Sequence, residues 1–154
     1  MLADSAPVLI WVNGADAGCE FANKAYLNFL GKTIAEVQGF GWQPHAHPDD
    51  NERYVGLYLS AFKTRTPFHC QARFLNAKGE YRWLDSVGAP RFSLSGEFLG
   101  YVGASRDITE NKRVELNTQF INQLDLALSH LTDADEIIQL ATSRLGEYLS
   151  LIHI

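Results

Sequence analysis

Four residues near the middle of the chain carry side chains that could bind a metal ion. His45 and His47 are separated by one residue, and Asp49 and Asp50 follow closely. Imidazole nitrogens and carboxylate oxygens are common ligands of divalent metals. The string His47-Pro48-Asp49-Asp50 is also typical of a helix start, because proline suits the first turn and acidic side chains are favourable at the positive helix end. A helix start explains these residues without a metal, so we predict no metal site.

The other reactive side chains show no spacing that is typical of catalysis. The sequence contains no nucleophile–base pair, no carboxylate dyad and no glycine-rich phosphate loop; Gly96, Gly100 and Gly103 lie around a predicted strand instead. Cys19 and Cys70 have neither a metal-binding nor a redox spacing. They suit a reducing cytosol as buried thiols, and a disulfide between them stays open. We therefore expect no enzymatic activity from this chain itself.

Composition and charge narrow the choice of partners. The chain has 154 residues and is 46% hydrophobic, so it can bury a core of its own. Residues 1–109 carry 11 acidic and 10 basic side chains, a net charge of −1, whereas residues 110–154 carry 7 and 3, a net charge of −4. No basic patch is present, so we expect no nucleic-acid partner. Without a signal peptide or an apolar run long enough to cross a bilayer, we predict a cytoplasmic location and no direct membrane contact; a longer parent protein is free to carry an anchor elsewhere.

Turn and cap signals divide the first 109 residues into short elements. Asn13-Gly14 is the strongest short hairpin signal, and Thr33 with Glu36 has the form of a capping box that opens a helix. Tight turns between the later strands imply antiparallel neighbours. The sequence thus predicts an α+β fold over about residues 5–109, with a five-stranded antiparallel sheet, short helices on one face, and a long C-terminal helix after it. The expected strands are residues 8–13, 19–22, 68–75, 80–89 and 98–108, and the expected helices are residues 24–30, 34 to near 39 and 48–63.

The helix that follows the last strand carries a regular apolar seam. Thr109 is a candidate N-cap, and no Gly or Pro occurs between Ala104 and Leu145. Spacings of seven, three, four and three are typical of a and d positions in helix pairing. The seam favours pairing with another helix, and a helix folded back on its own core is the alternative. Its residues are Val114, Ile121, Leu124, Leu128 and Leu131, with Asn117 at the remaining d position.

The order of elements and several local strings resemble the PAS family of sensor domains over nearly all of residues 5–110. The resemblance implies a five-stranded sheet whose concave face can enclose a ligand, and a chain end at Asp107-Ile108-Thr109 that couples the sheet to the following helix. The strings at its C-terminal end resemble the PAC-type signature. The matching strings are Glu20-Phe21-Ala22-Asn23, His47-Pro48-Asp49-Asp50, Gly79-Glu80-Tyr81-Arg82-Trp83-Leu84, Gly100-Tyr101-Val102-Gly103 and Asp107-Ile108-Thr109-Glu110.

The segment after residue 131 is similar to the opening helix of a GAF domain. Thr132 or Asp133 can cap this helix, which is expected over residues 132–148, and far more chain would be needed to complete such a domain. The sequence thus resembles a fragment of a larger signalling protein, with residues 110–131 as a linker helix. Residues 149–154 resemble a translated sequencing adaptor, so we attach no function to His153.

The resemblance also bears on cofactors. A haem-binding PAS domain would use a histidine on the helix that corresponds to residues 51–63, and none is present there. A flavin photosensor of the light-oxygen-voltage type would need a cysteine in an Asn-Cys-Arg-Phe-Leu-Gln string near that helix, and nothing matches it. We therefore expect neither haem nor covalently bound flavin. Non-covalent flavin and an unidentified small ligand stay open.

A ligand between sheet and helices would meet aromatic side chains and a few polar anchors. The competing interpretation is that the aromatic residues form the core and the polar ones face water. Strand alternation alone does not tell which face His69 and Arg73 take. The candidate ligand-binding residues are Trp42, Tyr58, Phe62, His69, Arg73, Trp83 and Ser105.

The junction between sheet and helix supplies candidate signal-transfer residues. On the strand order of the family, Arg82 and Asp107 should lie on adjacent strands, where a cross-strand ion pair can form. If exposed, such a pair contributes at most about 1 kcal/mol, so its value would lie in switching rather than in stability. We take Arg82, Asp107, Ile108 and Thr109 as the signal-transfer set.

Two classes of function fit this sequence. The first is a sensory and dimerising input module that pairs through the 110–131 helix and passes a signal to an output domain further along the parent chain. A sensor histidine kinase with PAS and GAF domains is the expected parent, and a diguanylate cyclase is the alternative. The second class is a structural PAS domain that holds two chains together and binds no small ligand.

Overall fold

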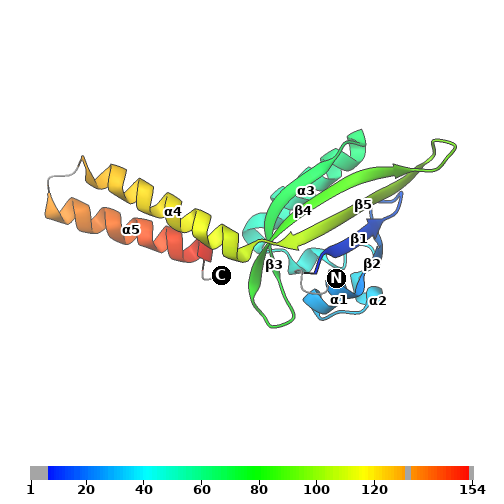
Figure 1. Ribbon diagram of the computed structural model, residues 1–154, viewed down its shortest axis with the longest axis horizontal. Helices are drawn as coiled ribbons and strands as arrows, with labels where there is room; N and C mark the ends of the chain where they lie inside the picture. Colours follow the sequence, from blue (N-terminus) through cyan, green and yellow to red (C-terminus); the bar gives the residue numbers. More distant parts are fainter. Residues whose placement is uncertain (1–6, 131–132, 153–154) are drawn as a thin grey trace. The chain divides into compact units, whose positions relative to one another are not determined.

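The computed structural model describes residues 7–130 and 133–152, which form two compact units (Figure 1). One unit extends to Ile108 and the other begins at Thr109. Leu131, Thr132 and His153, which the sequence singles out, lie outside the described residues.

The first unit is built on a five-stranded antiparallel sheet with the strand order β2-β1-β5-β4-β3. Because β5 lies between β1 and β4, the last strand of the unit is central and pairs with the first. The predicted α+β fold, with its five antiparallel strands, is confirmed. The strands are β1 (Leu9–Asn13), β2 (Cys19–Ala22), β3 (Phe68–Leu75), β4 (Tyr81–Phe92) and β5 (Phe98–Asp107).

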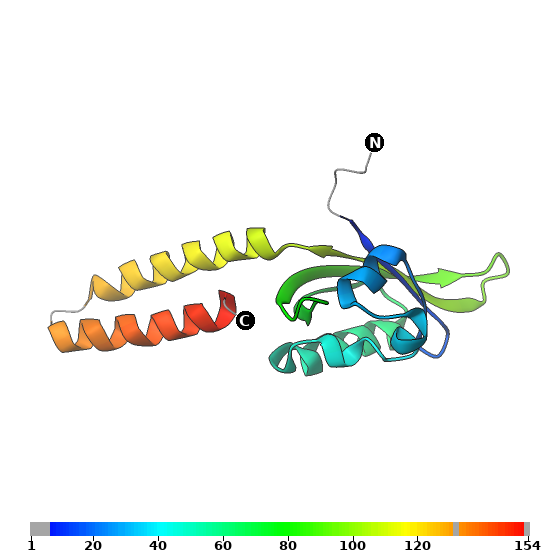
Figure 2. The ribbon, with the colours of Figure 1, turned by 90° about the horizontal axis from the view of Figure 1, so that it is seen from below.

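The helices of this unit lie on one face of the sheet (Figure 2). They are α1 (Lys24–Leu30), α2 (Ile34–Val37), the 3₁₀ helix η2 (Gln43–His45) and α3 (Pro48–Thr64). The predicted capping box is present, since Thr33 accepts from the Glu36 N–H while the Glu36 carboxylate accepts from the Thr33 N–H. The His47 ring accepts from the Asp49 N–H at 3.1 Å, so the histidine caps α3.

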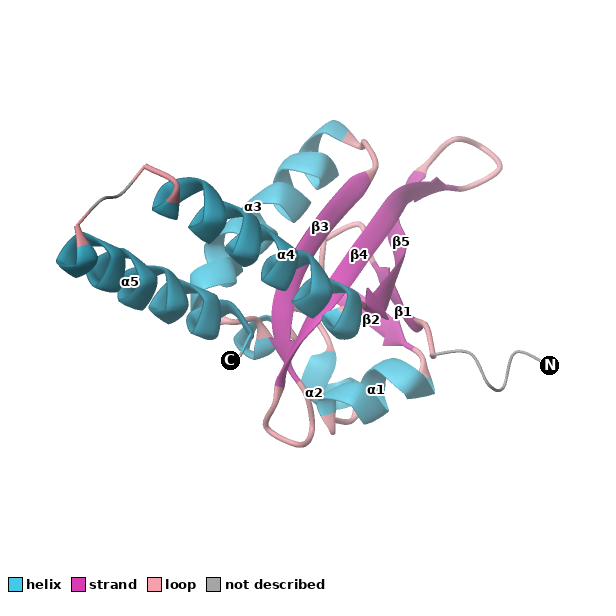
Figure 3. Ribbon diagram, turned by 60° about the vertical axis from the view of Figure 1, so that its left-hand side comes forward, coloured by secondary structure: helices cyan, strands magenta, loops and turns pink. Residues whose placement is uncertain are grey.

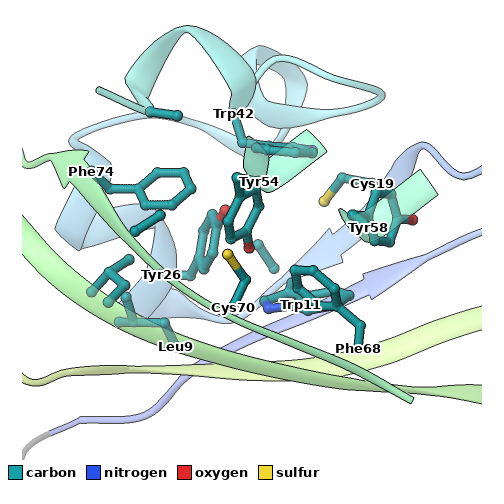
Figure 4. Packing of buried hydrophobic residues seen from close by; sticks show 14 of the residues in the cluster. Leu9, Trp11, Cys19, Tyr26, Trp42, Tyr54, Tyr58, Phe68, Cys70 and Phe74 are labelled. Carbon is teal, nitrogen blue, oxygen red and sulfur yellow. The ribbon is translucent and has the colours of Figure 1, made fainter. Parts of the chain in front are cut away.

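Between the sheet and these helices lies a core dominated by aromatic rings (Figure 4). Tyr58 is the centre of this packing: its ring meets those of Trp11, Trp42 and Phe68 edge-on, with centroids 5.7–6.4 Å apart. Edge-to-face contacts of this kind stabilise a core beyond the area they bury. Tyr54 makes similar contacts with Phe68 on β3.

The second unit is a hairpin of two antiparallel helices, α4 (Thr109–Leu128) and α5 (Ala134–Ile152) (Figure 3). Thr109 is the first helical residue rather than the cap that precedes the helix. Asp133 caps α5, since its carboxylate accepts from the Asp135 N–H at 2.7 Å. Tyr148 ties the helices together by stacking on Phe120 and donating to the Asn117 side chain at 3.0 Å.

Candidate ligand cavity and sheet-to-helix junction

The cavity between the sheet and the helices is small, about 20 Å³. That volume fits about one water molecule, whereas pockets for small ligands enclose roughly 300–1,000 Å³. A ligand larger than water would therefore need side chains to move aside. The lining residues are Trp11, Asn13, Cys19, Tyr26, Trp42, Tyr54 and Tyr58.

The Trp11 indole fills much of the space between sheet and helices. It lies over two glycines on neighbouring strands: a Cβ at Gly103 would overlap its six-membered ring, and one at Gly88 would come within 2.7 Å of it. The indole N–H donates to the Ser105 hydroxyl at 3.3 Å, and that hydroxyl lies 2.7 Å from the Ser86 hydroxyl. The glycines thus provide the room that the indole occupies, and the serines satisfy its polar atom.

Tyr58 joins α3 to β1 through its buried hydroxyl. The hydroxyl donates to the Ala17 carbonyl at 2.8 Å and accepts from the Asn13 amide nitrogen at 2.7 Å. Burial raises the pKa of Tyr58 to about 12, and the hydrogen bond from Asn13 only partly opposes this. The phenol is therefore neutral at physiological pH, which suits it to positioning and not to proton transfer.

Asp50 and Arg73 form a buried ion pair that joins the start of α3 to the edge strand β3. The Asp50 carboxylate accepts from Arg73 Nε, Arg73 Nη2 and the Arg73 backbone N–H, each at 2.8 Å. Burial by itself would raise the pKa of Asp50, but these hydrogen bonds and the guanidinium charge outweigh it and hold the pKa below its usual value. The guanidinium also lies 5.2 Å from the centre of the Trp83 ring.

Only some of the predicted ligand-binding residues meet at the cavity. Trp42 and Tyr58 line it directly. Ser105 lies beneath Trp11, and Phe62 packs farther along the core on Phe98 and Tyr101.

The remaining three do not line the cavity. His69 and Arg73 have the opposite parity on β3 to the core residue Cys70, and Trp83 is the cross-strand partner of Arg73. The exposed His69 ring pairs with Asp85. No described contact brings these three to the cavity.

Sequence reasoning missed several cavity residues, above all Trp11 and Asn13. The signal was present, because Leu9, Trp11 and Asn13 alternate along β1 and therefore share a face. Tyr54 lies one helical turn before Tyr58 on α3, so a spacing of four residues already places the two side chains on one helix face.

The candidate metal ligands between His45 and Asp50 have other roles in the fold. The His47 ring caps α3, and the Asp50 carboxylate is held by Arg73. Within residues 7–130 and 133–152, no three His, Cys, Asp or Glu side chains gather as a metal site would require.

At the junction, the last residues of β5 are bound to β4. Arg82 Nε donates to the Asp107 carboxylate at 2.8 Å in a partly exposed ion pair. The Ile108 N–H donates to the Trp83 carbonyl at 2.8 Å, one residue beyond the end of β5. Ile108 is itself buried. The hydrogen-bonded ladder of the sheet therefore continues to the residue directly before α4.

The strand order, the helices on one face and the cavity beneath them define a sensor-type domain. The family model for the PAS fold matches residues 20–105, more than half of the chain, so the chain belongs to the PAS family. PAS domains are non-catalytic sensory modules of signalling proteins.

One curated relative is much longer than this chain. The chain is 37% identical over 114 residues to the uncharacterized protein y4lL of Sinorhizobium fredii, covering 74% of this chain and 14% of that protein. The chain thus spans about one seventh of the length of this curated relative.

Two solved structures have a similar fold. A domain of a putative light and redox sensing histidine kinase from Haloarcula marismortui has 25% identity and a TM-score of 0.57, covering 70% of this chain and 94% of that one. The N-terminal domain of a diguanylate cyclase with a PAS/PAC sensor from Marinobacter aquaeolei has 21% identity and a TM-score of 0.59, covering 66% and 95%. Across the described part of the chain, none of the helices is both long enough and apolar enough to span a bilayer.

Proposed function

We propose that this chain is the sensory and dimerising input segment of a cytoplasmic histidine-kinase-type signalling protein. In this proposal, a change in the PAS domain biases the junction of Arg82, Asp107, Ile108 and Thr109. The helix that begins at Thr109 then carries the bias to an output domain further along the parent chain. The segment from residue 132 would begin a GAF domain in that parent.

The junction geometry is the observation that carries this proposal. Because Ile108 is buried and hydrogen-bonded to β4, a shift of β4 relative to β5 would displace the residue directly before α4. A switch needs a local change and an element that responds to it, and here the helix start is the responding element. The likeness to a domain of a histidine kinase supports this parent, and the likeness to a diguanylate cyclase domain keeps that enzyme as the alternative.

A structural PAS domain without a small ligand is the second candidate. The cavity of about 20 Å³ favours it, because the aromatic side chains already occupy the space that a ligand would need. Under the first candidate, Trp42, Tyr58 and Ser105 would contact a ligand only after Trp11 had moved. Native mass spectrometry of the purified chain separates the two. A retained small molecule supports sensing by ligand, and a protein without one supports the structural role.

Replacing Asp107 by asparagine should change output while leaving the fold nearly intact. The Arg82–Asp107 pair is partly exposed, so its loss should cost at most about 1 kcal/mol of unfolding free energy. Autophosphorylation of the full-length parent should shift at least about threefold in either direction. Glu97→Gln provides the control, because Glu97 is an exposed carboxylate in the turn before the same strand. Unchanged output in the Asp107→Asn parent would contradict the proposed role of the junction.

A further inference from the structure

A groove of about 600 Å³ lies beside the aromatic core of the first unit. Pockets for small ligands enclose roughly 300–1,000 Å³, so this groove has the size of a ligand site, whereas the core cavity of about 20 Å³ does not. One wall is α1, and the start of β1 and the end of β5 form the rest. The side chains that matter here are Lys24, Ala25, Asn28 and Phe29 from α1, Leu9 from β1 and Asp107 from β5.

Hydrogen bonds at both ends of α1 hold this wall in place. Asn23, which caps the helix, donates to the Val8 carbonyl at 2.9 Å and accepts from the Ile10 N–H at 3.1 Å, so it joins α1 to β1. At the other end of the helix, the Phe29 carbonyl accepts from the Ala77 N–H at 2.7 Å. The groove is therefore preformed, which spares a ligand the cost of ordering its walls.

The floor of the groove is apolar. Leu9 is buried, and Ala25 and Phe29, one helical turn apart on α1, are partly buried against the same core. Leu9 pairs with Ser105 across the strands, so Asp107, two residues beyond Ser105, lies on the same face of the sheet. A ligand on this floor would bury apolar side chains and meet a carboxylate at the end of β5.

Two opposite charges border this floor on different walls. Lys24 and Asn28 are exposed one turn apart on α1, whereas the Asp107 carboxylate belongs to β5. Asp107 accepts from Arg82 Nε at 2.8 Å, and because a carboxylate has about four acceptor positions, it can also accept from a ligand ammonium. A ligand with a cationic end, an apolar middle and an anionic end complements this arrangement.

A short apolar peptide with free ends has this distribution of charge. Its ammonium and carboxylate lie at opposite ends, and each residue adds up to about 3.3–3.6 Å between them. A free amino acid holds its two charges close together, which suits separate walls less well, and a fatty acid has no cationic end. Two leucines supply both the separation of charge and the side chains for the floor.

We infer that this groove binds a short apolar peptide with free ends, its ammonium at Asp107 and its carboxylate at Lys24. The inference rests on the proposed function in one respect, since Asp107 belongs to the junction before α4. It adds a class of ligand and places the binding site beside that junction instead of within the aromatic core. A bound ammonium shares the Asp107 carboxylate with the Arg82 guanidinium, so binding weakens the ion pair that joins β4 to β5.

Calorimetric titration of the purified chain with leucyl-leucine and two blocked forms tests the two ends. N-acetylation removes the ammonium and C-terminal amidation removes the carboxylate, and each should weaken binding by roughly tenfold, as expected for the loss of one charged hydrogen bond. In Asp107→Asn the acetylated form should bind as tightly as the free dipeptide, and in Lys24→Gln the amide should. Lys32→Gln is the matched control, because Lys32 is exposed just beyond α1 and outside the groove; it should bind like the wild type.

Ala25→Phe tests the apolar floor independently of charge. The larger side chain would occupy the groove and should abolish binding of leucyl-leucine. Ala35→Phe, on an exposed position of α2, is the control and should leave binding unchanged. Because Lys24 is exposed, Lys24→Gln keeps the test decisive even if Ala25→Phe fails to fold.

The link to the junction is tested in the full-length parent. Leucyl-leucine should shift autophosphorylation of the wild type and of Lys32→Gln, and it should leave Lys24→Gln unchanged at the same concentration. Binding without any shift in output would contradict the effect on the Arg82–Asp107 pair.

Three further outcomes would overturn the inference. If leucyl-leucine binds the wild type with a Kd weaker than about 1 mM, the groove is not a peptide site. If acetylation costs as much affinity in Asp107→Asn as in the wild type, the ammonium does not meet Asp107. If free leucine binds as tightly as the dipeptide, the site does not recognise separated ends. In each case the Asp107→Asn output measurement still tests the junction separately.

Discussion

Replacing Asp50 by asparagine should lower the free energy of unfolding by about 3–5 kcal/mol. The substitution leaves the buried Arg73 guanidinium without its carboxylate and weakens three charge-assisted hydrogen bonds. Arg53, whose Nη2 lies 3.9 Å from the same carboxylate, would lose part of its stabilisation as well. Urea unfolding at pH 7 measures the loss.

Asp49→Asn is the matched control for this prediction. Asp49 is the preceding residue, in the same helical turn, but it is exposed and its carboxylate makes no comparable ion pair among the described residues. Its replacement should change stability by less than about 0.5 kcal/mol. If Asp49→Asn and Asp50→Asn lost equal amounts of unfolding free energy, the negative charge at the helix terminus would be the stabilising feature, and not the buried ion pair.

The Asp50 variant should also change how stability depends on pH. The pKa of Asp50 is lowered in the folded state, so its carboxylate stabilises the fold above the unfolded-state pKa of about 3.9, and this contribution is lost as pH falls through the folded-state value. The stability difference between wild type and Asp50→Asn should thus be full at pH 6 and shrink below about pH 4. A difference that stays constant from pH 6 to pH 2.5 would contradict the assignment.

Trp11→Ala should cost about 3–5 kcal/mol of unfolding free energy and enlarge the small cavity of the wild type to a size that admits a ligand. The indole is buried over Gly88 and Gly103, and neither glycine has a side chain that could refill the space. Millimolar indole should raise the melting temperature of Trp11→Ala by several degrees and leave the wild type unchanged. No response of the variant to indole would mean that the core collapses around the lost side chain.

The complementarity of Trp11 and Gly103 can be tested with a second substitution. Gly103→Ala should destabilise the wild type by about 1–3 kcal/mol, because the new methyl group overlaps the indole. In the Trp11→Ala background the same change should cost much less. Gly56→Ala is the control, since a Cβ there has nothing within 4 Å and alanine favours the helix. Equal costs of Gly103→Ala in both backgrounds would locate the strain in the backbone.

Local signals in the sequence determined most of the fold. Three helices begin at caps formed by hydrogen bonds between residues at most four apart. These caps lie at Asn23, at the Thr33–Glu36 capping box and directly before Pro48. Such interactions form wherever the residues occur, so a sequence reveals them directly. The tight turns then required antiparallel neighbours, and the family resemblance placed Arg82 and Asp107 on adjacent strands, which the pairing of β4 with β5 confirms.

The site depended on contacts that no local pattern specifies. Alternation along β3 separates His69 and Arg73 from Cys70, but a period of two does not say which set faces the core. That choice is made by the packing of α3, whose Tyr54 and Tyr58 rings cover Phe68, a residue of the same parity as Cys70. Likewise, the seven-residue spacing of Val114 and Ile121 predicted an apolar row, while only the pairing of α4 with α5 decided that this row stays exposed.

The sequence by itself therefore determined the elements, most of their caps and the PAS class of the domain, because these follow from neighbouring residues and from the order of motifs. The tertiary structure alone decided that Trp11 occupies the ligand space, because the indole meets Gly88 and Gly103 only after strands distant in sequence have paired. The space left for a ligand is the volume enclosed by the fold minus the volume of the side chains inside it. Because the interior is closely packed, this remainder follows only from the three-dimensional structure.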